Sequence, residues 1–154
     1  MKRLSVLSLI LMLAFVSCSK EEEVVNTQNL TGMIDGIEFD AKSGTVIELF
    51  DDRLSFEIYN ENVGGLDPCG LLTQDIHIYF TCEKSTDRQE LFLDFTTFEG
   101  FTVTLSNPEG DKKIATQGFI ELKSIEDDLV ELTMDVQFDD DNFAKGEFAA
   151  TVCN

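Results

Sequence analysis

The chain is poor in several residue types on which common protein chemistries depend. Its 154 residues include no tryptophan, two tyrosines, one histidine and only 11 lysines and arginines, against 30 aspartates and glutamates. A single histidine, His77, leaves no second imidazole for a two-histidine metal site, and no motif supports a Ser-His-Asp triad. With no tryptophan, only Tyr59 and Tyr79 could supply flat amphipathic rings for stacking on sugars, so the composition leaves glycan binding open without supporting it.

The shortage of basic residues gives the chain a formal net charge of −19. Nucleic-acid affinity rests on lysine and arginine side chains that displace counterions from phosphates. The same side chains hold proteins to anionic membrane surfaces. The composition therefore excludes nucleic acid as a partner and excludes electrostatic membrane binding. Its simplest interpretation is solubility, and recognition of a cation or a basic partner is the alternative.

Only one long apolar run is found, at residues 4–16, directly after Lys2 and Arg3. It is shorter than the roughly 20 residues that a helix needs to cross a bilayer, but it fits the core of a secretory signal peptide. We therefore expect residues 1–17 to be a cleaved signal peptide. Its removal would leave nine basic and 30 acidic residues, a net charge of −21.

This segment ends at a cysteine. The motif Phe15-Val16-Ser17-Cys18 resembles a bacterial lipobox, in which the cysteine thiol receives a diacylglyceryl group and the chain is cut just before it. The resemblance implies lipidation of Cys18 and a membrane anchor, since two or three acyl chains hold a protein firmly without a transmembrane helix. The alternative is a chance cysteine beside an ordinary secretory cleavage site.

The residues that follow are charged. The motif Ser19-Lys20-Glu21-Glu22-Glu23 resembles the signal that sends Bacteroidetes lipoproteins to the outer face of the outer membrane. The resemblance implies a lipid-anchored protein at the outer membrane that faces the cell exterior. Charged residues before a folded domain also make a solvated flexible tether, and we assign residues 18–29 to such a tether under either interpretation.

From about residue 30 onward, apolar and polar residues alternate with a period of two. The clearest case is LVELTMDVQF at 129–138, and residues 54–59, 75–82 and 101–106 follow the same pattern. Strands with one wet face belong to antiparallel sheets. The sequence therefore predicts an all-β domain over residues 30–154, an antiparallel two-sheet β-sandwich of about nine or ten strands. The turn candidates are Asp35-Gly36, Asp51-Asp52-Arg53, Asn107-Pro108-Glu109-Gly110 and Asp139-Asp140-Asp141-Asn142.

The order of several short motifs adds a resemblance to this pattern. The segments GMIDGIEF at 32–39, DPCG at 67–70 and GEFAATVC at 146–153 resemble those of small β-sandwich lipoproteins from Flavobacteria and Bacteroides. The resemblance implies a fold and a location, and it brings no catalytic residues.

Three cysteines remain once Cys18 is set apart. An exported protein meets an oxidising environment, so we expect one disulfide and one free thiol. A Cys69–Cys153 bridge would close about 85 residues and a Cys69–Cys82 bridge about 14, worth roughly 4–5 and 3 kcal/mol respectively in the loop-entropy treatment. We favour Cys69–Cys153, with Cys82 unpaired, because it ties the end of the chain to its longest loop and because both cysteines lie in motifs of that resemblance.

Acidic residues supply the remaining candidate site. The segment DDDNFAKGE at 139–147 is loosely similar to a calcium loop, which makes Asp139, Asp140 and Asp141 candidate calcium ligands. Its phenylalanine and glycine depart from the EF-hand pattern. We expect no other metal or cofactor, because the cysteine spacings match no zinc pattern. His77 alternates with apolar neighbours and is predicted to lie on the wetter face of its strand.

These observations favour a non-enzymatic, lipid-anchored binding or accessory module whose ligand is unknown. Two alternatives stay open. A small carboxylate-dependent hydrolase would need two carboxyls about 5–9 Å apart across a cleft, and 30 acidic residues make such pairs unspecific. A lipocalin-like barrel that holds an apolar ligand would need an internal cavity.

Overall fold

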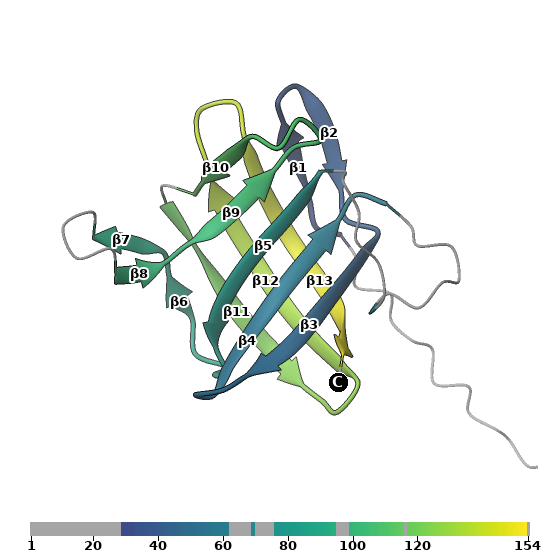
Figure 1. Ribbon diagram of the computed structural model, residues 1–154, viewed down its shortest axis with the longest axis vertical. Helices are drawn as coiled ribbons and strands as arrows, with labels where there is room; N and C mark the ends of the chain where they lie inside the picture. The colour runs from purple at the N-terminus through teal and green to yellow at the C-terminus, as the bar shows by residue number, and fades with distance from the viewer. Residues whose placement is uncertain (1–28, 62–68, 70–75, 95–98, 116, 154) are drawn as a thin grey trace, which may run out of the picture.

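The computed structural model describes residues 29–61, 69, 76–94, 99–115 and 117–153, and its regular elements are β-strands (Figure 1). The all-β class predicted from the alternation is therefore confirmed. Among the described residues, no helix is long and apolar enough to cross a membrane. The strands are β1 (Thr31–Ile34), β2 (Ile37–Asp40), β3 (Ser43–Leu49), β4 (Arg53–Tyr59), β5 (His77–Glu83), β6 (Gln89–Glu90), β7 (Phe92–Asp94), β8 (Glu99–Phe101), β9 (Val103–Ser106), β10 (Lys112–Ile114), β11 (Gln117–Ile125), β12 (Leu129–Gln137) and β13 (Phe143–Cys153).

Strand β12 shows why these segments adopt the β conformation. Buried and half-buried residues alternate along its whole length, and the buried ones are Val130, Leu132, Met134 and Val136. Because successive side chains of a strand point to opposite faces, this pattern requires a sheet with one covered face. The covered faces meet in one hydrophobic core.

Eleven strands form one sheet, in the order β10-β9-β5-β4-β3-β13-β12-β11-β6, and the β1–β2 hairpin joins it at β13. Strands β7 and β8 form a separate hairpin. The sheet curls, so that β3, β4, β5 and β9 cross in front of β11, β12 and β13 (Figure 1). The core lies between these two walls, where the rings of Phe56 and Phe80 stack with centroids 4.8 Å apart and Phe148 is fully buried.

Strand β13 connects the two walls, because it has two successive partners along one edge. Its residues 143–145 pair with β1, and its residues 151–153 pair in parallel with β3. Gly146 lies between these two stretches with a φ of 137°, and a Cβ there would meet the carbonyl oxygen of Asn29 at 2.3 Å. Asn29, the last residue of the predicted tether, bonds to Glu147 here through its backbone N–H and its side-chain oxygen. The close approach therefore requires glycine.

The predicted antiparallel two-sheet sandwich differs from this architecture and is corrected by it. The two walls belong to one continuous mixed sheet, because β13 pairs with both β12 and β3, and the β13–β3 pair is parallel. The described residues contain thirteen strands, not nine or ten, and the extra ones include β6 and β10, which have two and three residues. Alternation specifies which face of a strand is buried but not which strand lies beside it, and very short strands hardly show it.

The predicted turns are confirmed where the chain reverses direction. Asp35 and Gly36 join β1 to β2 with φ values of 50° and 76°, as a type I′ hairpin turn requires. Asp51 and Asp52 turn β3 into β4, also with positive φ. The two later candidates connect β9 to β10 and β12 to β13.

Candidate functional site

The outward face of β4 and β5 gathers the chain's polar ring side chains. Tyr59 on β4 lies directly opposite His77 on β5, and Tyr79 follows two residues later on β5. The ring centroids are 5.8 Å apart for Tyr59 and His77, and 5.7 Å apart for His77 and Tyr79. The chain has no other tyrosine or histidine. The register of two strands has therefore brought all three together, and we call them the tyrosine–histidine row.

Polar side chains flank this row on both sides. Glu57 of β4 lies opposite Tyr79, and Thr104 of β9 lies opposite Tyr79 on its other side. Beyond Thr104, the Nζ of Lys112 on β10 lies 5.5 Å from the centroid of the Tyr79 ring, within the range of a cation–π interaction. Glu57 and Lys112 are exposed, and Tyr79 is half-buried. The face thus presents an aromatic centre with a carboxylate on one side and an ammonium on the other.

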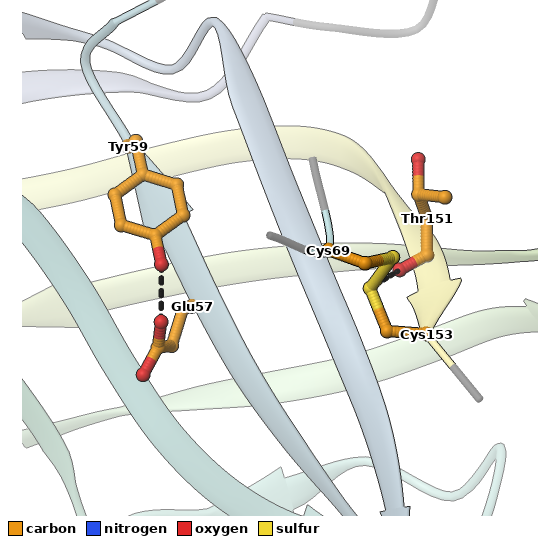
Figure 2. Close-up of a disulfide and its surroundings, with 5 residues drawn as sticks. All are labelled: Glu57, Tyr59, Cys69, Thr151 and Cys153. Carbon is orange, nitrogen blue, oxygen red and sulfur yellow. Dashed lines mark hydrogen bonds between the residues drawn. A yellow bond between two sulfur atoms is a disulfide. The ribbon is translucent and has the colours of Figure 1, made fainter. Parts of the chain in front are cut away.

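Tyr59 is the most buried member of the row, although it lies on the outward face. Only 3% of it is exposed, and its hydroxyl donates a hydrogen bond to Oε2 of Glu57 (Figure 2). Burial, and then this hydrogen bond, raise the pKa of the Tyr59 hydroxyl above its usual value. The phenol therefore stays protonated at physiological pH and holds the Glu57 carboxylate in place as a hydrogen-bond donor.

The disulfide lies beside β3, next to this face. Cys69 and Cys153 are joined across a sequence separation of 84, with Cα atoms 5.5 Å apart (Figure 2). In the parallel pair, Cys153 lies opposite Ile47 of β3. This is the pairing that the sequence analysis favours, and it fastens the end of β13. Cys82 is free and belongs to the hydrophobic core, where burial raises the pKa of its thiol to about 12.

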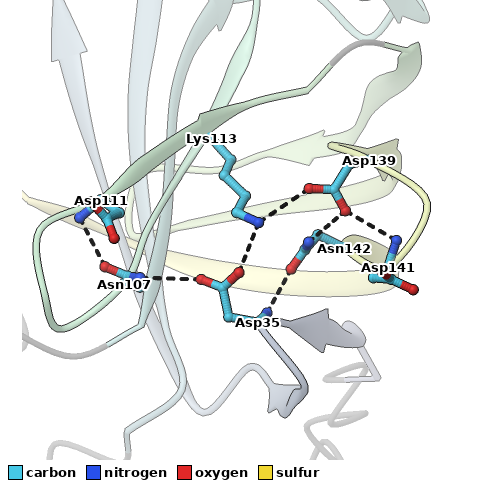
Figure 3. Close-up of polar contacts among 7 residues, drawn as sticks. All are labelled: Asp35, Asn107, Asp111, Lys113, Asp139, Asp141 and Asn142. Carbon is cyan, nitrogen blue, oxygen red and sulfur yellow. Dashed lines mark hydrogen bonds and ion pairs between the residues drawn. The ribbon is translucent and has the colours of Figure 1, made fainter.

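A second polar group joins three turns at one end of the sheet (Figure 3). The Nζ of Lys113 lies 2.7 Å from Oδ1 of Asp35 in the β1–β2 turn and 3.2 Å from Oδ2 of Asp139 in the β12–β13 turn. Asn107 donates to Oδ2 of Asp35 at 3.1 Å, and the buried Asn142 accepts from the backbone N–H of Asp35 at 2.6 Å. We call these five residues the lysine network. It holds together turns that are far apart in the sequence.

The charges of the lysine network stabilise one another. The hydrogen bonds from Lys113 and then Asn107 lower the pKa of Asp35 below its usual value. The pKa of Asp139 is lowered first by its hydrogen bond from Asn142. Asp35 and Asp139 in turn raise the pKa of Lys113. All three groups therefore stay charged over a wide pH range.

The candidate calcium ligands lie in the β12–β13 turn, where Asp139 belongs to this network, and they line an open depression of about 700 Å³. Oδ1 of Asp139 accepts the backbone N–H of Asp141 at 3.0 Å and a hydrogen bond from Asn142, while Oδ2 accepts from Lys113. The Lys113 ammonium thus lies between two carboxylates, where a metal cation would otherwise be attracted. In the part of the chain that the structure describes, no three or more His, Cys, Asp or Glu side chains are placed to hold a metal ion. Asp140 is exposed.

The other predicted site residues fall elsewhere. The predicted lipidation site Cys18 and the predicted export-signal residues Ser19, Lys20, Glu21 and Glu22 lie outside the described residues, as does the predicted signal peptide at 1–17. His77 projects from the outward face of β5 and is half-buried, as expected.

Sequence reasoning missed the tyrosine–histidine row. The alternation around residues 54–59 and 75–82 places all three side chains on the faces opposite the apolar residues. It does not say that β4 and β5 pair, or that Tyr59 lies opposite His77. The sequence therefore contains no indication that the two tyrosines and the histidine are neighbours. The only available signal was their shared position on outward faces.

Comparison with known proteins assigns no family to the chain. It matches no known protein family, and neither a characterised protein nor a solved structure shows significant similarity to it.

Proposed function

We propose that the chain is an exported lipoprotein that displays a non-enzymatic binding module on the cell surface. In this proposal, residues 1–17 are a signal peptide, a lipid on Cys18 anchors the protein in the outer membrane, and Ser19 to Glu22 direct it to the exterior. The ligand would bind to the folded domain, outside the membrane.

One observation carries the proposal of export: the disulfide between Cys69 and Cys153. Structural disulfides persist in oxidising compartments outside the cytoplasm and are rare inside it. The third cysteine of the domain, Cys82, is buried in the core, where its thiol is shielded from exchange with this disulfide. This arrangement is the one expected of a domain that folds after export.

The described carboxyls support binding more than carboxylate-dependent hydrolysis. A general acid needs a raised pKa so that it carries a proton at neutral pH. The pKa values of Asp35 and Asp139 are instead displaced downward. They also bond to Lys113 and to the turns around them. Their arrangement is that of a structural ion-pair network.

Metabolic labelling with an alkyne fatty acid tests the anchor. We expect the wild-type protein and Cys82→Ala to incorporate the label, and Cys18→Ala to lose it, because only Cys18 follows the lipobox-like motif. Cys82→Ala is the matched control for removal of a cysteine that is not lipidated. Labelling of Cys18→Ala at the wild-type level would contradict the proposal.

Protease added to intact cells tests the orientation. We expect the wild-type protein to be degraded, whereas a variant with Lys20, Glu21 and Glu22 replaced by alanine stays protected inside the outer membrane. Full protection of the labelled wild-type protein would refute surface display while leaving the lipid anchor intact.

A further inference from the structure

We propose that the outward face around Tyr79 binds a neutral oligosaccharide. Tyr79 would stack on a sugar ring, and Glu57 and Thr104 would bond to its hydroxyl groups. This inference names the ligand class of the proposed binding module, and in that sense it rests on the proposed function.

The face gathers the chain's polar ring side chains in one place. The chain's only histidine and both of its tyrosines form one continuous row with ring centroids less than 6 Å apart. Tyrosine offers an apolar ring together with a polar edge, which suits a ligand whose own surface is mixed. A sugar has this character, because its C–H groups form apolar patches and its hydroxyls form a polar rim.

The groups around the row are placed on strands. Glu57 and Thr104 lie opposite Tyr79 on the two neighbouring strands. Tyr59 holds Oε2 of Glu57, and the Glu57 side chain is otherwise exposed on this face. Binding groups fixed by regular structure lose little conformational freedom when a ligand arrives.

A neutral ligand fits this face better than a charged one. An anion would meet the Glu57 carboxylate and the field of a chain with a net charge of −19. A cation that stacked on Tyr79 would meet the Lys112 ammonium, which already lies over that ring. A neutral ligand meets neither repulsion and can bond to both charged groups. Nucleic acids are excluded for the same reason as other polyanions.

Tyrosine fluorescence offers a direct test, because the chain lacks tryptophan and both of its tyrosines belong to the row. The purified full chain is titrated with cellohexaose, maltohexaose and xylohexaose as neutral probes. A chitosan hexamer and an alginate hexamer serve as cationic and anionic probes of similar length. We expect a saturable change with at least one neutral probe and a weaker response to both charged ones.

Four variants locate the binding. Tyr79→Ala is expected to weaken binding of the neutral probe at least tenfold. Tyr79→Phe, which keeps the ring, is expected to weaken this binding less than threefold. Glu57→Gln alters an exposed side chain, so it tests the face without disturbing the fold. Phe92→Ala removes an aromatic side chain that is 61% exposed and lies off the row, and it should bind like the wild type. Isothermal titration calorimetry provides a second measurement where a tyrosine has been removed.

The proposal is overturned if none of the neutral probes saturates the signal, if a charged probe binds more tightly, or if Tyr79→Ala and Glu57→Gln both bind like the wild type. The same titration with Cys18→Ala separates the two proposals, because sugar binding does not depend on the anchor. Wild-type protein that binds a neutral probe but carries no fatty-acid label refutes the lipoprotein proposal alone, whereas labelled wild-type protein that binds no neutral probe refutes the sugar site alone.

Discussion

Removal of the Cys69–Cys153 disulfide should cost much of the domain's stability. The bridge spans a sequence separation of 84, and the loop-entropy treatment assigns a loop of that length about 4.6 kcal/mol at 25 °C. This free energy comes mainly from the unfolded chain, which the bridge prevents from expanding. Domains of this kind are stable by only about 5–15 kcal/mol in total. We therefore expect Cys69→Ala/Cys153→Ala to be barely folded or to unfold early in a urea titration.

The assay is equilibrium unfolding in urea, followed by tyrosine fluorescence and far-ultraviolet circular dichroism. With a urea m value of about 1.5 kcal/mol per molar, the midpoint should fall by roughly 3 M. The reduced wild-type protein should unfold at the same urea concentration as the double variant. Cys82→Ala keeps the disulfide and loses only a small buried side chain, so its midpoint should fall by less than half as much. A shift below 0.5 M in the double variant would refute the reasoning.

Three further predictions concern the core, the β13 junction and the lysine network. Phe56→Ala should destabilise the domain by about 3–5 kcal/mol, because Phe56 is fully buried. Phe50→Ala should change stability by less than about 0.5 kcal/mol, because Phe50 is 93% exposed. Equal urea midpoints for the two variants would contradict this expectation. Gly146→Ala should lower the melting temperature sharply, since its Cβ would meet the backbone oxygen of Asn29 at 2.3 Å. A melting temperature equal to the wild type would show that the segment at Asn29 can move away from β13 without cost. Lys113→Met should be less stable than the wild type at neutral pH, and the difference should shrink as the pH falls below 3.8, because the lowered pKa values of its two carboxyl partners confer stability that is present above pH 3.8 and is lost on acidification. A difference in stability that persists unchanged at the lowest pH would exclude these ion pairs as its source.

The strands and several turns follow from local sequence. Alternation over 129–138 predicts β12 and its buried face, and Asp35-Gly36 predicts a type I′ turn with both φ values positive. Both inferences succeed because they depend on neighbouring residues alone: a strand repeats every two residues, and a tight turn demands particular backbone angles. Phe50, Phe92 and Phe143 are exposed, which their residue type does not indicate.

The candidate site was much less predictable. Lys113 of β10 meets Asp35 and Asp139 of two turns that are far from it in the sequence, and no local pattern indicates that these segments meet. The same holds for Tyr59 and His77, which are neighbours only because β4 and β5 pair in one particular register. Sites built across strands depend on pairing, and a shift of one residue would send every side chain to the other face.

The sequence by itself determined the properties that depend on composition and on short-range pattern. These are the acidic character, the β conformation, the outward or inward face of each long strand, and the lipobox-like motif at Cys18. Only the tertiary structure decided that β13 pairs with both β12 and β3, which turns two layers into one curled sheet. It also decided that Tyr59, His77 and Tyr79 lie side by side. The physical reason is that hydrogen bonds between strands join residues far apart in the chain, and their register is selected by the packing of the whole core.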